Sequence, residues 1–291
     1  MSQARREEAA RPDDAACPGD AARPGDAARA GPRVLAAAGT GLLAAMVVAQ
    51  VVSGVRAEPE RLTGAVVVLL AASAVAFSAS RAGTARAAGA FAAAVATGYA
   101  AEWIGVRTGV PFGAYSYTPV LRPQLGGVPV LVAVAWGGMG LAAHAVAAAL
   151  VPAGGPARIA AGALALTAWD LFLDPQMLRL GLWTWHDTGP YRGVPVSNFL
   201  GWLVVSALVM AVIDVLLRAS GPGRAGRRRV GGRQERAAPS GGLVAIYCVM
   251  AVMETVAFAA VFEPPDRLVA VAGGVAMGIF AVPAGRRRWP R

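Results

Sequence analysis

The chain has 291 residues, of which 56% are hydrophobic and only 15% are charged. A mean hydropathy of +0.52 excludes an ordinary soluble domain and favours a membrane protein. The net charge of +10 rests on 27 arginines with no lysine, and because these arginines lie in short segments between apolar runs, they indicate membrane topology and not nucleic-acid binding.

Residues 1–33 carry six acidic residues and several prolines, and they predict a disordered cytoplasmic tail without a signal peptide. The apolar runs that follow predict an all-α, polytopic integral membrane protein with about eight transmembrane helices. The transmembrane domain should cover 34–285, with a basic cytoplasmic linker at 218–241 inside it and a basic C-terminal tail at 286–291. The expected spans are 34–55, 62–80, 87–106, 128–151, 157–173, 199–217, 243–262 and 268–282.

The arginines are distributed unevenly between the two sides of this bundle. With the N-terminus in the cytoplasm, 20 arginines fall on the cytoplasmic side and 7 on the other. Cytoplasmic loops are enriched in arginine, so we expect both termini in the cytoplasm of a bacterial plasma membrane protein. The loops 107–127 and 174–198 should then lie together on the outer side.

Two carboxylates stand at the outgoing end of the fifth expected span, in residues 169–175 (WDLFLDP). Asp170 and Asp174 are four residues apart, so both lie on one face of a helix. A charge at membrane depth is costly and usually serves ion traffic, chemistry or pairing with another charge. These acids are therefore candidate catalytic residues.

The acids belong to a spacing pattern that occurs twice. Glu102 and Asp170 each stand thirteen residues before an aromatic residue, and each copy continues to a GVPV segment with a tryptophan nine residues after its glycine. We interpret the pattern as a parallel internal duplication (third and fourth spans, fifth and sixth spans) that places Glu102 and Asp170 at equivalent depths. The copies run through Tyr115, Tyr117, 127–130 and Trp136 in the first, and through Trp183, Trp185, 193–196 and Trp202 in the second.

A pocket between the two copies is the functional interpretation of this pattern, with Glu102, Asp170 and Asp174 as catalytic acids. The alternative is that Glu102 pairs with Arg107 and Asp174 with Arg179, and that these pairs only fix the helix ends. Three candidates also have an alternative that involves no substrate. Trp185 would anchor the chain at the membrane interface, His186 would be an exposed loop residue without a function, and Asn198 would cap a helix. The candidate substrate-binding residues are Trp103, Arg107, Tyr115, Tyr117, Trp183, Trp185, His186, Asn198 and Trp202.

Other polar residues in the spans rank lower. His144 is expected to be a packed, hydrogen-bonded core residue, and Asp214 to form a helical pair with Arg218. Glu254 lies mid-span without a local partner, so it is either a further member of the site or an acid kept neutral by apolar surroundings. Cys17 lies in the expected polar tail and Cys248 in an expected span, so they do not imply a disulfide or a metal cluster.

Motifs for nucleotides, redox cofactors, catalytic metals and diphosphate substrates are missing from the sequence. We therefore expect no cofactor and no metal, and no nucleic-acid partner.

Four stretches carry a family resemblance: 102–118 (EWIGVRTGVPFGAYSYT), 169–177 (WDLFLDPQM), 181–185 (GLWTW) and 193–202 (GVPVSNFLGW). Over roughly 34–285 the chain resembles the carotenoid-biosynthesis membrane proteins typified by the bacterioruberin-pathway hydratase, a family related to carotenoid 1',2'-hydratases. It is more faintly similar to the small membrane lycopene cyclases, whose paired acids after a proline are absent here. The resemblance implies a lipophilic carotenoid substrate, contact with membrane lipid and with other enzymes of the carotenoid pathway, and a cofactor-independent hydro-lyase.

The implied reaction adds water to the terminal double bond of an acyclic (ψ) carotenoid end group. Such an alkene must first be protonated, and the tertiary cation is then captured by water, which requires a desolvated acid, an aromatic wall and a second carboxylate. The three acids and their aromatic neighbours supply this set, although the sequence does not assign donor and acceptor. One alternative is a carotenoid end-group cyclase, which shares the protonation step. Another is a proton-coupled transporter, but the sequence shows no series of polar residues from the acids to the cytoplasmic side, which argues against it.

Overall fold

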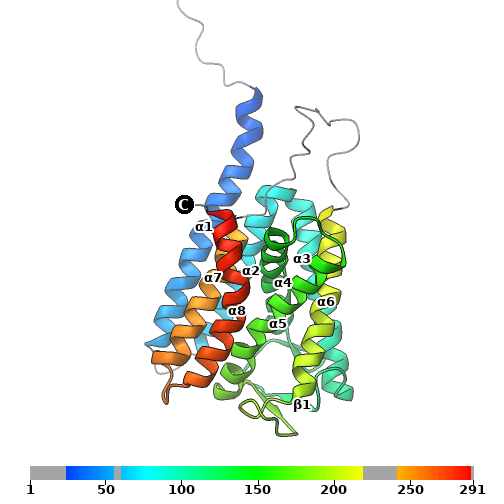
Figure 1. Ribbon diagram of the computed structural model, residues 1–291, viewed down its shortest axis with the longest axis vertical. Helices are drawn as coiled ribbons and strands as arrows, with labels where there is room; N and C mark the ends of the chain where they lie inside the picture. Colours follow the sequence, from blue (N-terminus) through cyan, green and yellow to red (C-terminus); the bar gives the residue numbers. More distant parts are fainter. Residues whose placement is uncertain (1–23, 56–59, 219–240, 290–291) are drawn as a thin grey trace, which may run out of the picture.

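The computed structural model describes residues 24–55, 60–218 and 241–289. The segment 219–240, which makes up almost all of the expected basic linker, and residues 1–23 of the expected tail lie outside the described residues. Eight helices run along one bundle (Figure 1). They are α1 (Pro24–Gly54), α2 (Glu60–Ala82), α3 (Thr84–Thr108), α4 (Val130–Leu150), α5 (Pro156–Arg179), α6 (Val196–Arg218), α7 (Gly241–Val256), continued by the π-helical turn η1 (Ala257–Val261), and α8 (Arg267–Arg288).

Each expected span coincides with one of these helices, which confirms the all-α, multi-pass membrane fold. Seven of the helices in the described residues are long and apolar enough to cross a membrane, and α3 is not among them. With 25 residues α3 has sufficient length, but its interior consists largely of alanine and glycine and includes Glu102, so it is less apolar than its neighbours. At the ends, α1 begins at Pro24 and α8 reaches Arg288, so both enter segments that we had expected to be tails.

Helix α4 forms the centre of the bundle, and it packs against α2, α3, α5, α6, α7 and α8. Its middle is built from small residues, including Gly137 and Gly138. A Cβ atom at Gly138 would lie 2.3 Å from the side chain of Leu70 on α2, so only glycine allows this close approach. Close packing through small residues is how helices associate without help from water.

The loops that follow α3 and α5 meet at one end of the bundle through a short antiparallel pair of strands, β1 (Tyr115–Tyr117) and β4 (Trp183–Trp185). In Figure 1 this end lies opposite the start of α1 and the end of α8. Tyr115 faces Trp185 and Tyr117 faces Trp183 across the pair. A second pair, β2 (Gln124–Leu125) with β3 (Val128–Pro129), leads the chain into α4.

Equivalent segments of the expected duplication thus pair with each other: Ser116 lies opposite its own counterpart Thr184, and Tyr115 and Tyr117 each lie opposite the counterpart of the other. A two-fold relation between the copies would give this register. The duplication itself stays a prediction.

Candidate active site

Glu102 on α3 is buried, and three hydrogen-bond donors converge on its carboxyl group. The hydroxyls of Tyr115 and Tyr117 donate to Oε2 at 2.5 and 2.7 Å, and the indole nitrogen of Trp136 donates to Oε1 at 3.0 Å. A carboxylate accepts hydrogen bonds and donates none, so this surrounding suits a negative charge at Glu102.

The two tyrosines come from β1, outside the spanning helices. Burial, and then the charge of Glu102, raises the pKa of both Tyr115 and Tyr117 well above the ordinary value. Both hydroxyls therefore keep their protons at physiological pH and remain donors to Glu102.

Asp170 and Asp174 lie side by side on α5, and both are buried. The amide nitrogen of Asn198, near the start of α6, donates to Oδ2 of Asp170 at 2.7 Å and also to Oδ2 of Asp174. The indole of Trp183 donates to Oδ1 of Asp174 at 2.8 Å. Oδ1 of Asp170 accepts no hydrogen bond from any described residue. The side chain of Asn198 thus bridges the two acids, and a helix-capping role does not account for it.

Aromatic rings beside these acids pack in two groups, one around Trp202 and one around Tyr115 and Tyr117. The indoles of Trp136 and Trp202, which are counterparts in the expected duplication, stack with ring centroids 4.1 Å apart and planes 20° apart. Trp169 meets Trp202 edge-on, and Tyr117 meets Trp183 edge-on. Ring faces carry negative partial charge and stabilise cations.

A small cavity of about 20 Å³ lies among the acids and rings, with room for about one water molecule. Side chains from α3, α5, α6 and both paired strands line it, including Glu102, Asp174, Asn198, Tyr115, Tyr117, Trp183, Trp185 and Trp202.

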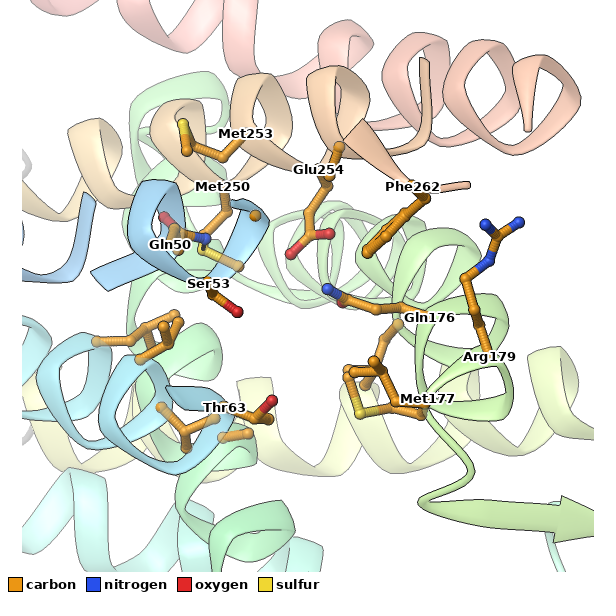
Figure 2. Close-up of a pocket in the computed structure, with 18 of the residues that line it drawn as sticks. Gln50, Ser53, Thr63, Gln176, Met177, Arg179, Met250, Met253, Glu254 and Phe262 are labelled. Carbon is orange, nitrogen blue, oxygen red and sulfur yellow. Dashed lines mark hydrogen bonds between the residues drawn. The ribbon is translucent and has the colours of Figure 1, made fainter. Parts of the chain in front are cut away.

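A second cavity, of about 1060 Å³, adjoins the first and is lined mainly by apolar side chains of α1, α2, α4, α5 and α7 (Figure 2). Its size and character suit a large apolar ligand. The two cavities share part of their lining, namely Val132, Leu173, Trp183 and Trp202. The shared indoles therefore lie between a large cavity and a water-sized one that is lined by Glu102 and Asp174.

Three of the candidate substrate-binding residues lie apart from both cavities. Trp103 is 42% exposed, and the Arg107 guanidinium sits 4.0 Å from its ring centroid. His186 is exposed and shares a 2.7 Å hydrogen bond with Ser116. The other candidates line at least one cavity.

The alternative in which local arginines neutralise the acids is wrong. Arg107 donates to the carbonyl oxygens of Trp103 and Gly126, and Arg179 donates to the carbonyl oxygen of Pro264. Neither arginine contacts Glu102 or Asp174, so the acids are held by neutral donors.

Polar residues elsewhere in the spans form a separate group at the other end of the bundle. His144 is buried with its Nε2 3.1 Å from Asp214, as expected for a packed histidine, and Arg158 lies 3.3 Å from the same carboxylate. The pairing of Asp214 with Arg218 cannot be examined, because the side chain of Arg218 lies outside the described part. Among the described residues, no three His, Cys, Asp or Glu side chains form a group that could hold a metal.

Sequence reasoning did not place Trp136, Trp169, Gln50 or Gln176 in the site, although all four line the large cavity. For Trp136 a signal was present, because it is the counterpart of Trp202 in the duplicated pattern. Glu254, which we had singled out as an acid without a local partner, also lines this cavity.

Comparison with known proteins identifies the family. The sequence profile described as "carotenoid biosynthesis protein" matches residues 63–280, which is most of the chain. The chain belongs to this carotenoid biosynthesis family. A relative named bisanhydrobacterioruberin hydratase, from Haloarcula japonica, is 32% identical over 135 residues, which are 45% of this chain and 44% of the relative. The match thus spans less than half the length of that relative. No solved structure matches the chain.

Proposed function

We propose that this family member is a hydratase that adds water to the terminal carbon–carbon double bond of an acyclic carotenoid end group. One observation carries the proposal: a large apolar cavity adjoins a water-sized cavity lined by carboxylates, and both share an indole wall. The hydratase activity of the Haloarcula japonica relative supports the same reaction class.

The chemistry requires three elements, since a terminal alkene of this kind has no carbonyl group to activate it. A carboxylic acid protonates the less substituted carbon, and the positive charge develops on the tertiary carbon. The faces of Trp183 and Trp202 stabilise that charge. Water from the small cavity then attacks the cation.

The carboxylates at the small cavity act in the second half of the reaction, the capture of the cation by water. Glu102 and Asp174 line the space where the water sits, and either one accepts the proton that the attacking water loses. Asp170 acts through Asn198, whose amide it shares with Asp174. The protonation and capture steps need no cofactor, since no electron is gained or lost.

The substrate is lipophilic, and we propose that it enters the large cavity from the membrane. Several helices around this cavity also expose large apolar side chains that do not line it, such as Val48 on α1 and Val252 on α7. These faces suit membrane lipid, in which a carotenoid dissolves. Contacts with other enzymes of the pathway would hand the substrate over within the membrane.

The test uses membranes that contain the full chain, an acyclic carotenoid with ψ ends, and buffer prepared with heavy-oxygen water. The expected product is more polar, one water heavier, and labelled in a tertiary hydroxyl. Membranes from the same host without the chain are the control. A product of unchanged mass with a terminal ring would indicate a cyclase, and proton flux without any change of pigment would indicate a transporter. A strict requirement for reduced flavin, nicotinamide or iron would also refute the proposal.

A further inference from the structure

Three polar side chains line the large cavity and have no role in the site described above. Glu254 on α7, Gln50 on α1 and Gln176 on α5 all line it, and each comes from a different helix. Figure 2 shows the Glu254 carboxyl and the Gln176 amide pointing toward each other in the cavity. An ionisable side chain inside a membrane bundle most often has a function.

Glu254 differs from Glu102 and Asp174 in its hydrogen bonding. It is only 5% exposed, and its Oε2 accepts no hydrogen bond from any described residue. Glu102, in contrast, has three donors, and Asp174 is bonded by Asn198 and Trp183. An ionised carboxyl without donors in apolar surroundings is costly, so Glu254 is equipped to carry a proton, whereas Glu102 and Asp174 are equipped to carry charge.

The position of Glu254 separates it from the other acids as well. Of the four acids Glu102, Asp170, Asp174 and Glu254, only Glu254 lines the large cavity, and the other three do not. Proton transfer to carbon requires direct contact between the acid and the alkene. An alkene held in the large cavity can therefore touch Glu254, whereas indole rings separate it from Glu102.

The backbone at this position is also unusual. Two residues after Glu254, α7 changes into the π-helical turn Ala257–Val261. The turn ends the helix, since Phe262 after it has an extended backbone. The turn carries Phe258, whose ring stacks on Phe172 of α5, and so fixes α7 against the helix that bears Gln176.

We propose that Glu254 is the proton donor, an assignment that rests on the proposed hydratase function. The O–H bond of Glu254 breaks as a C–H bond forms at the less substituted alkene carbon, and the π bond is lost to give the tertiary cation. Water adds to the cation and passes its extra proton to Glu102 or Asp174. That carboxyl releases a proton to the medium, Glu254 takes one up, and the net change is the addition of one water. Gln50 and Gln176 line the same cavity and give the Glu254 carboxyl polar neighbours there.

Deuterium exchange separates proton donation from water capture. In D2O, a cation that is not captured loses a proton again, so the recovered substrate gains deuterium whenever the donor works. Glu102→Gln should lose product yet retain deuterium uptake, because only the capture step is damaged. Glu254→Gln should reduce both product and deuterium uptake by about 100-fold or more, and Glu254→Asp should restore part of each.

Two controls make the result specific. Asp187→Asn removes a carboxyl from an exposed residue that lines neither cavity and should leave both rates within about two-fold of the wild type. The amount of carotenoid that copurifies with Glu254→Gln should also equal that of the wild type, since the amide preserves the shape. Loss of the bound carotenoid in this variant, or retention of its deuterium uptake, would overturn the assignment of the donor. If the wild type forms a ring product and takes up deuterium only with Glu254 present, the hydratase proposal fails while the donor assignment stands.

Discussion

The hydroxyl of Tyr191 donates a hydrogen bond of 2.9 Å to the backbone carbonyl oxygen of Leu171. In a regular helix this carbonyl would accept from the N–H of residue 175, but residue 175 is a proline inside α5 and has no N–H. The tyrosine in the loop after β4 thus replaces a missing helical bond one turn from Asp174. Burial raises the pKa of Tyr191 to about 12, so the hydroxyl remains a donor at neutral pH.

Removal of this hydroxyl should destabilise the protein. Tyr191→Phe leaves the Leu171 carbonyl without a partner and should cost about 1–2 kcal/mol, measured by thermal unfolding in detergent. Pro175→Ala restores the backbone N–H, so the double variant should recover most of the loss. Tyr99→Phe is the matched control, because the Tyr99 hydroxyl bonds an exposed carbonyl that water can satisfy. Equal losses for Tyr191→Phe with and without Pro175→Ala would contradict this account.

The carboxyl groups of Glu102 and Asp174, which line the small cavity, and of Asp170, which shares the Asn198 amide with Asp174, should be essential for turnover. Glu102→Gln and Asp170→Asn preserve shape but cannot exchange protons, so each should reduce product per unit of protein by about 100-fold or more. Asp174→Asn should also reduce it, and to a smaller extent if Asp174 mainly tunes Asp170. Asp214→Asn and His144→Ala, which lie in the separate polar group, should retain turnover per folded protein. Full activity in both primary amide variants would show that those acids are structural.

Gly98, four residues before Glu102 on α3, should be critical for the site. A Cβ atom at Gly98 would lie 2.4 Å from Cγ of Trp136, so Gly98→Ala must displace the indole that donates to Glu102. We expect a loss of about 1–3 kcal/mol in stability and a clear loss of product. Gly89→Ala on the same helix meets no atom within 4 Å and should be neutral or stabilising. Unchanged product in the Gly98→Ala variant would show that Trp136 does not need this position.

The arginine distribution predicts that the β1–β4 end of the bundle faces outward and that both termini face the cytoplasm. In a variant without Cys17 and Cys248, single cysteines at Ser116 and Thr188 should react with a membrane-impermeant reagent in intact cells. A cysteine at Ser220, in the basic linker, should react only after the membrane is opened. Labelling at Ser220 together with protection at Ser116 would reverse the orientation.

An ion pair fixes the loop after β4 to the start of α8, and it should make stability depend on pH. Asp266 caps α8 and lies 2.7 Å from Arg192. Although partial burial opposes it, hydrogen bonds from Arg192 and the backbone lower the pKa of Asp266. The carboxylate therefore stabilises the fold above the unfolded-state pKa of about 3.9, and this contribution is lost as pH falls through the lower folded-state value.

The wild type should accordingly melt at a higher temperature than Asp266→Asn. The difference between the two melting temperatures should be largest near pH 6 and should shrink below about pH 4. High salt should also shrink it, because the pair is near the surface. A difference that stays constant across this range would show that the charge of Asp266 contributes nothing.

The sequence predicted the helices well because each span is a long apolar run, and it placed Glu102 and Tyr115 in one candidate site because the spacing of thirteen recurs. The sequence predicted less about Asp170. Trp183, which stands thirteen residues after Asp170, donates its hydrogen bond to Asp174 instead. The first copy has no acidic residue at the position that corresponds to Asp174. The large cavity was beyond prediction, because it depends on how side chains of α1, α5 and α7 pack in space. The change from α7 to a π turn likewise has no local signal.

The volume of the small cavity has a further consequence for the proposed reaction. A space for about one water stores the nucleophile as a single molecule, so each turnover empties the store and refilling becomes a step of the cycle. The rate would then follow the thermodynamic activity of water at the membrane surface. Osmotic stress, which lowers that activity, would slow this step of the pathway while the protein remained fully folded.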